Sequence, residues 1–159
     1  MNAYKVALLG HRYLYSQGVE KRLYKTLKDL IMTKSYVEIY IGREGEFDIL
    51  AASVVKRLQK DLLRDNCEMS LVLPYLKKNI EYYAQYYDNI TIPERVEGMH
   101  PKAAIGERNK WMVEKCDLLI CYVERKNGGA HNALKYAQKL GKRTVNLSTA
   151  QQGLAASAY

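Results

Sequence analysis

Short apolar runs alternate with amphipathic segments along most of the chain. Residues 37–41 (VEIYI) and 117–123 (DLLICYV) carry the β-branched and aromatic side chains that favour strands. Between such runs, Val19, Leu23 and Leu27 recur at the spacing of an amphipathic helix. Strands that alternate with helices are joined by right-handed crossovers and lie parallel, with helices on both faces. The sequence therefore predicts an α/β fold, a single Rossmann-like three-layer domain with a mainly parallel sheet.

The same pattern places each element along the chain. Strands are expected at residues 5–9, 37–41, 69–73, 117–123 and 144–147, with a short strand or only a connection at 91–93. Helices are expected at residues 19–31, 49–62, 82–87, 103–114 and 131–140. Ile49, Ala52 and Val55 are expected on the buried face of the second helix. The length favours one domain, at residues 1–148, followed by a loosely ordered tail at 149–159.

The composition is that of an ordinary globular protein, with 48% hydrophobic and 26% charged residues. No apolar run approaches the roughly 18 residues that a membrane helix needs, so no membrane partner is expected. The N-terminal sequence MNAYKVALLGHR lacks the charged region and the cleavage site of a signal peptide. This favours a cytoplasmic location.

The cysteines and histidines do not form the pattern of a metal site. The three cysteines lack CxxC spacing, and Cys116 and Cys121 flank or lie in an apolar strand, so buried reduced thiols are expected. His11, His100 and His131 are scattered, without an HExxH motif. We therefore expect no structural metal, and no residue pattern implies a cofactor.

The formal net charge of +8 favours anionic partners. Such a charge suits a nucleic acid as well as a phosphorylated small molecule. The basic pairs at residues 21–22, 56–57 and 77–78 are spread along the chain, which favours a solvated basic surface over a dedicated nucleic-acid groove. A homo-oligomer is compatible with such a fold, although no stripe of the sequence identifies an interface.

Three glycine-bearing loops follow expected strand ends, at residues 10–12, 42–48 and 127–132. Ligands of α/β proteins bind beyond the carboxyl ends of the strands, so we expect these loops to converge on a site. The turn at Gly128-Gly129 precedes a helix whose N-terminal N–H groups and dipole suit a phosphate. The alternative is a tight connection that uses glycine only for its backbone angles.

Polar residues near these loops add candidate ligand contacts. His131 and Asn132 lie in the first turn of the expected helix, and the amide of Asn127 can contact a ribose or a base. Arg12 and Arg108 can each clamp a phosphate through the planar guanidinium group. The alternative for each arginine is an ordinary surface position.

The loop at residues 42–48 (GREGEFD) is neither a Walker loop nor a GxGxxG motif, although its glycines permit close approach to a ligand. Asp48 suits a cap of the following helix at least as well as a ligand contact. Glu44 and Glu46 would repel a phosphate, so they are expected near ribose hydroxyls. If buried, either becomes a candidate general acid or base with a raised pKa. His11 is expected to be a hydrogen-bonded turn histidine rather than a catalytic one.

The motifs GHR, GREGEFD, LVLPY, RNKWMV, CDLLICYV and NGGAHNALKYA, in this order, resemble the SLOG superfamily over about residues 5–147. The most similar branch is the YpsA-like type of small bacterial proteins (DUF1273). The resemblance implies a Rossmann-like fold that binds nucleotides or nucleotide-derived ligands at the glycine loops. Related phosphoribohydrolases of the Lonely Guy type carry an arginine before a strand and a PGGxGTxxE motif after it. Arg108 matches that arginine, but Lys135 replaces the catalytic glutamate, which favours recognition over catalysis.

The sequence thus predicts a protein that binds a nucleotide or a nucleotide-derived ligand of the nucleotide-sugar or ADP-ribose type. The expected ligand-binding residues are Gly10, His11, Arg12, Gly42, Arg43, Gly45, Asp48, Arg108, Asn109, Asn127, Gly128, Gly129, His131 and Asn132. Two other functions stay open. One is a glycosidase or transferase acting on N-glycosidic bonds of nucleosides or nucleotides, with a carboxylate from Glu44, Glu46, Asp48 or Glu107. The other is binding of single-stranded DNA.

Overall fold

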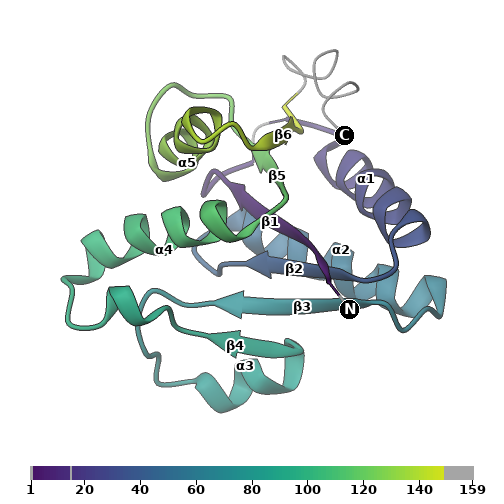
Figure 1. Ribbon diagram of the computed structural model, residues 1–159, viewed down its shortest axis with the longest axis horizontal. Helices are drawn as coiled ribbons and strands as arrows, with labels where there is room; N and C mark the ends of the chain where they lie inside the picture. Colours follow the sequence, from purple (N-terminus) through teal and green to yellow (C-terminus); the bar gives the residue numbers. More distant parts are fainter. Residues whose placement is uncertain (1, 15, 149–159) are drawn as a thin grey trace.

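The computed structural model describes residues 2–14 and 16–148. In this part of the chain, six strands alternate with five α-helices and one short 3₁₀ turn. The strands form a single sheet that is covered by helices on both faces (Figure 1). The predicted α/β class and Rossmann-like arrangement are therefore confirmed. The expected tail at residues 149–159 lies outside the described residues.

The sheet is parallel throughout the described pairings. Its strands are β1 (Tyr4–Gly10), β2 (Val37–Ile41), β3 (Cys67–Val72), β4 (Asn89–Thr91), β5 (Leu118–Tyr122) and β6 (Arg143–Asn146). Their order across the sheet is β4-β3-β2-β1-β5-β6. The chain builds outward from β1 to β4 and then continues on the other side of β1. This reversal between β1 and β5 leaves a crevice beyond their carboxyl ends.

Helices cover the two faces of the sheet in pairs. They are α1 (Val19–Thr33), α2 (Glu46–Leu62), α3 (Ile80–Tyr86), α4 (Pro101–Lys115) and α5 (Gly129–Lys139), with the 3₁₀ turn η1 at Glu94–Val96. α1 packs beside α2 on one face, and α4 packs beside α5 on the other. Figure 1 draws α2 behind the sheet and α4 in front of it. The short helix α3 lies next to β4 at the edge of the sheet.

β1 is buried on both faces, which explains its continuous apolar sequence. Val6 and Leu8 belong to the core under α1 and α2, whereas Ala7 and Leu9 belong to the core under α4 and α5. α5 contributes mainly small side chains to its core, with Ala130 in the first turn. These small residues let α5 approach the sheet closely and bring its N-terminus near the end of β1.

The expected elements are present, with boundaries that differ by a few residues. The short strand before α4 is formed by Asn89–Thr91, slightly earlier than residues 91–93. One expectation is wrong: the helical spacing places Ile49 on the buried face of α2, but its side chain is 55% exposed. The helix begins at Glu46, and Phe47 in its first turn enters the core instead.

Within the described residues, no helix is long and apolar enough to cross a membrane. The cytoplasmic location stays a prediction. All three cysteines are free thiols. Burial raises the pKa of Cys121 to about 12 and that of Cys116 to about 11, so both are protonated, poorly nucleophilic thiols at neutral pH.

Candidate functional site

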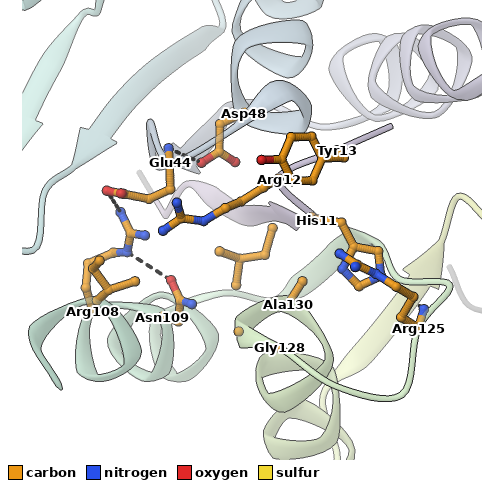
Figure 2. A pocket seen from close by; sticks show the side chains of 14 residues that line it. His11, Arg12, Tyr13, Glu44, Asp48, Arg108, Asn109, Arg125, Gly128 and Ala130 are labelled. Atoms are coloured by element: carbon orange, nitrogen blue, oxygen red, sulfur yellow. Dashed lines mark hydrogen bonds and ion pairs between the residues drawn. The ribbon is translucent and has the colours of Figure 1, made fainter. Parts of the chain in front are cut away.

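A cavity of about 240 Å³ lies beyond the carboxyl ends of β1 and β5, at the reversal point of the sheet. Its wall comes from the loop after β1, the loop before α2, one face of α4, the loop after β5 and the first turn of α5. The expected glycine loops therefore converge on one cavity (Figure 2).

The first turn of α5 presents backbone amides that no side chain caps. Gly128 precedes the helix with φ +93°. Glycine adopts this positive-φ conformation at little steric cost, whereas a residue with a side chain would be strained there. The first backbone hydrogen bond of the turn runs from the N–H of Asn132 to the carbonyl of Gly128 at 3.0 Å. The amides of residues 129–131 come before it and have no carbonyl one turn behind them. Together with the helix dipole, they can bind an anion.

His11 ties the loop after β1 to the loop after β5. Its Nε2 accepts the amide N–H groups of Glu124 and Arg125 at 2.9 and 3.1 Å, and its side chain is buried. Burial, together with the charge of Arg125, lowers the pKa of His11, so the ring is neutral with Nε2 as an acceptor. His11 lines the cavity, but its contacts fix the position of the loop that carries Arg125.

Arg12 follows directly and extends across the cavity towards Glu44 and Arg108 (Figure 2). Its backbone is clamped against the start of α2, because the carbonyl of Arg12 accepts the N–H of Glu46 at 2.8 Å. A Cβ atom on Gly45 would lie 2.5 Å from Cα of Arg12, so this contact requires glycine. Gly45 therefore positions an exposed arginine without lining the cavity itself.

Arg108 on α4 is almost fully buried, with 1% of its surface exposed. Its Nε donates to Asn109 Oδ1 at 2.9 Å, and its Nη1 donates to the carbonyl of Val72 at 2.8 Å. Burial lowers the pKa of Arg108, and the nearby carboxylates of Asp48 and Glu44 oppose this effect. Glu44 Oε1 lies 3.9 Å from Nη1. Arg108 thus forms a cationic part of the cavity wall whose charge the carboxylates of Asp48 and Glu44 balance.

Asp48 is buried in the cavity wall and is not the N-cap residue of α2. The helix begins at Glu46 after the cap residue Gly45, so Asp48 lies in the first turn. Its Oδ2 accepts the N–H of Glu44 at 2.8 Å, while Oδ1 has no hydrogen-bond partner among the described residues. Burial raises the pKa of Asp48 to about 6, although the Glu44 amide and Arg108 favour the ionised form. Such a group titrates near neutral pH.

The cavity brings together much of the predicted site. The expected residues that line it are Gly10, His11, Arg12, Glu44 and Asp48 from the first two loops, and Arg108, Asn109, Gly128 and Gly129 from α4 and α5. Gly42 lies against this wall, since a Cβ atom there would come within 2.6 Å of Arg108 Nη1. The other expected residues have contacts elsewhere or do not line the cavity.

Glu46, Arg43 and Glu107 are engaged outside the cavity. Glu46 Oε2 accepts the N–H of Leu14 at 2.9 Å. Arg43 donates to the hydroxyl of Tyr87 at 3.1 Å and lies over the ring of Tyr83. Glu107 pairs with Arg95 at 3.4 Å.

The three polar residues around the glycine turn do not line the cavity wall either. These residues are Asn127, His131 and Asn132. Lys135, which replaces the glutamate of the phosphoribohydrolase motif, is exposed and also lies outside the cavity lining. In this region, the backbone of the turn forms the wall, rather than the side chains that flank it.

The sequence patterns did not identify five lining residues: Leu9, Tyr13, Ile105, Arg125 and Ala130. Arg125 had a usable signal, because it follows an apolar strand and precedes a glycine turn in an α/β pattern. Tyr13 likewise follows the GHR motif directly. Leu9, Ile105 and Ala130 could not be identified from the sequence, because an aliphatic residue in a cavity wall has the same sequence pattern as one in the core. No group of three metal-ligating side chains occurs among the described residues.

No protein-family model matches the sequence, and no curated protein matches it. Solved structures resemble the fold. DNA processing protein A from Streptococcus pneumoniae is 17% identical with a TM-score of 0.68, and the match covers 91% of this chain and 50% of that one. The single-stranded-DNA-binding DNA processing protein A from Helicobacter pylori is 17% identical with a TM-score of 0.64, covering 90% and 64%. This chain thus spans about half to two thirds of their lengths.

A third solved structure is covered over most of its length. The molybdenum cofactor binding protein from Rippkaea orientalis is 15% identical with a TM-score of 0.64, and the match covers 98% of this chain and 84% of that one. At such low identities, the likeness establishes a shared fold and no more. The chain has the fold of these DNA processing and cofactor-binding proteins.

Proposed function

We propose that the cavity binds a nucleotide or a nucleotide-derived ligand. The phosphate would lie at the first turn of α5, with the sugar towards the loop at residues 42–48. One observation carries this proposal: three arginines, Arg12, Arg108 and Arg125, line the same cavity as the uncapped N-terminus of α5. Guanidinium groups and helix N-termini are the groups that proteins use to hold phosphates. On its sequence motifs, we also assign the chain to the YpsA-like branch.

The size of the cavity indicates how much of the ligand it encloses. Ligand pockets usually measure roughly 300–1,000 Å³, and this cavity measures about 240 Å³. It would therefore enclose the phosphate and the sugar, while the rest of a nucleotide would extend past the exposed side chain of Tyr13. A larger nucleotide-sugar can bind with one phosphate and one sugar in the same cavity.

A thermal-shift titration tests the proposal with AMP, ADP, ADP-ribose and NAD, and with adenosine as the ligand that lacks phosphate. A ligand at 100 times its Kd stabilises a protein by about 2.7 kcal/mol, which raises the Tm of a chain of this size by roughly 5–10 °C. We expect this shift from phosphorylated ligands and a much smaller one from adenosine. If no member of the panel shifts the Tm, the proposal is wrong.

A matched pair of variants separates the cavity from the overall charge. Arg12→Glu should weaken binding of AMP roughly tenfold to a hundredfold, because it replaces a donor to the phosphate with a carboxylate. Arg64→Glu makes the same change in charge at an exposed position in the loop between α2 and β3. This loop lies at the amino ends of the strands, opposite the cavity. This variant should leave the affinity nearly unchanged. Equal losses in both variants would point to a general charge effect instead.

A second candidate function is hydrolysis or transfer at the N-glycosidic bond, and Asp48 is the observation that favours it. A buried carboxyl with a pKa of about 6 in the cavity can act as a general acid or base. Release of free base from AMP would support this function if Asp48→Asn abolished it. Glu107→Gln is the control, because Glu107 pairs with Arg95 outside the cavity. Activity that survives Asp48→Asn would rule out this mechanism.

A third candidate is binding of single-stranded DNA, which the name of the Helicobacter pylori protein states for that protein. The net charge of +8 supports it for this chain. Binding to DNA should weaken steeply as the salt concentration rises. Absence of binding even at low salt would eliminate this candidate. Self-association stays a prediction that gel filtration can check.

A further inference from the structure

The cavity contains a buried carboxylate oxygen that no described residue satisfies. Asp48 is 5% exposed, and its Oδ1 atom accepts no hydrogen bond among the described residues. Glu44 Oε1 also accepts none, although Lys77 Nζ lies 3.7 Å away. Buried acceptors nearly always have a donor, from the protein, from water or from a ligand. This part of the wall therefore suits a group that donates a hydrogen bond.

The neighbouring arginine balances the charge of this wall without satisfying its acceptors. Arg108 directs its Nε to Asn109 and its Nη1 to the carbonyl of Val72. Its closest approach to a carboxylate is the 3.9 Å contact with Glu44, which is too long for a hydrogen bond. Among the described residues, the amide of Glu44 is the one hydrogen-bond donor to the Asp48 carboxyl group, and it contacts Oδ2.

The chemistry of the two sides of the cavity differs. Figure 2 draws Glu44 and Asp48 on one side, and Gly128 and Ala130 at the start of α5 on the other. A phosphate would be repelled by the carboxylates and attracted by the amides of α5. A neutral hydroxyl group has the opposite preference, because it donates to a carboxylate and carries no charge. The cavity thus suits a ligand with an anionic end and a hydroxyl-bearing end.

We infer that Asp48 accepts a hydrogen bond from the 2′-hydroxyl of the ligand, so that the cavity selects ribonucleotides over deoxyribonucleotides. This inference rests on the proposed function, in which a phosphate lies at α5. In this arrangement the carboxylate of Glu44, on the same side of the cavity, would accept from the adjacent sugar hydroxyl. DNA, which lacks the 2′-hydroxyl, is then a poor occupant of the cavity. A site built around a substrate hydroxyl discriminates strongly against the analogue without it, because its acceptor is left unpaired.

The test compares AMP with 2′-deoxy-AMP by calorimetric titration at pH 8, above the pKa of about 6, where Asp48 is ionised. A hydrogen bond to a charged group changes the affinity by roughly tenfold to a hundredfold. We expect AMP to bind more tightly by at least about tenfold. Equal affinities for the two nucleotides would overturn the inference and leave the proposed function intact. Failure of both nucleotides to bind would overturn both.

Variants identify the acceptor. Asp48→Ala should bring the affinity ratio close to one by weakening AMP, with little effect on 2′-deoxy-AMP. If this variant does not fold, Asp48→Asn serves instead and should lower the ratio, because hydrogen bonds to neutral acceptors are about half as strong. Glu107→Ala removes a carboxylate on α4 outside the cavity and should keep the wild-type ratio. An unchanged ratio in the folded Asp48 variant would contradict the inference.

Discussion

Replacing Asp48 by asparagine should stabilise the protein at alkaline pH relative to acidic pH. Burial raises the pKa of Asp48 from its ordinary value of 3.8 to about 6. The folded protein therefore holds a proton that the unfolded chain releases between pH 4 and pH 6. The contribution of Asp48 to the free energy of unfolding is fully present below about pH 4 and is lost as the pH rises through about 6. Asp48→Asn keeps the acceptor for the Glu44 amide but removes the ionisable group.

The magnitude follows from the two pKa values. At 1.36 kcal/mol per unit of pKa, the difference between about 6 and 3.8 corresponds to about 3 kcal/mol at pH 7 and above. The new amide group needs an acceptor, and an unsatisfied one costs about 1–3 kcal/mol at every pH. The stability of the variant relative to wild type should therefore rise by up to about 3 kcal/mol between pH 4 and pH 8. For a chain of this length, this is roughly 6–12 °C in Tm.

Urea unfolding of the wild type and the variant at pH 4 and at pH 8 measures this change. The cost of the unsatisfied amide is the same at both pH values, so it cancels in the comparison. Asp29→Asn is the control, because it neutralises an exposed carboxylate on α1 and should change stability by less than about 0.5 kcal/mol. A variant whose relative stability is the same at both pH values would show that Asp48 is not a desolvated carboxylate. The account of the cavity wall would then be wrong.

Two further predictions concern the support of the site. Gly42→Ala should destabilise the fold by about 1–3 kcal/mol in urea unfolding, because its Cβ atom would lie 2.6 Å from Arg108 Nη1. Gly106→Ala is its matched control, since nothing lies within 4 Å of a Cβ atom in that helix, and it should stabilise by about 0.5–1 kcal/mol. Equal effects would contradict the close contact at Gly42. Arg108→Ala should destabilise by about 3–5 kcal/mol at pH 8, because Asp48 and Glu44 lose their buried counter-charge, and a change below about 1 kcal/mol would refute that pairing.

The fold was predictable because its signals are local and repeated. Apolar runs such as residues 37–41 and 117–123 mark strands, and the amphipathic spacing between such runs marks the helices. Parallel connections then determine which strand ends share an edge, and the three glycine loops do lie there. Ile49 is exposed because each three-residue step turns only about 300°, so the series 49, 52, 55 drifts around the helix and its first member lies outside the buried face.

The details of the site depend on contacts between distant residues. The sequence predicts Arg12 and Arg108 as phosphate ligands alike, but the structure exposes Arg12 and buries Arg108, on α4, against β3. Glu46 and Asp48 are two residues apart in the first turn of α2, yet only Asp48 lines the cavity. About half a helical turn separates these two positions, and the sequence pattern does not show which of the two sides faces the cavity. Tertiary packing sets the burial that raises the pKa of Asp48.

A crystal structure of the protein soaked with AMP well above its Kd tests phosphate binding at α5 most directly. We expect a phosphate within about 3.2 Å of an amide nitrogen of residues 129–131, with the guanidinium of Arg12 in contact. The sugar should lie towards Asp48. A phosphate bound elsewhere, or a nucleotide held with its sugar at α5, would contradict phosphate binding at this helix N-terminus.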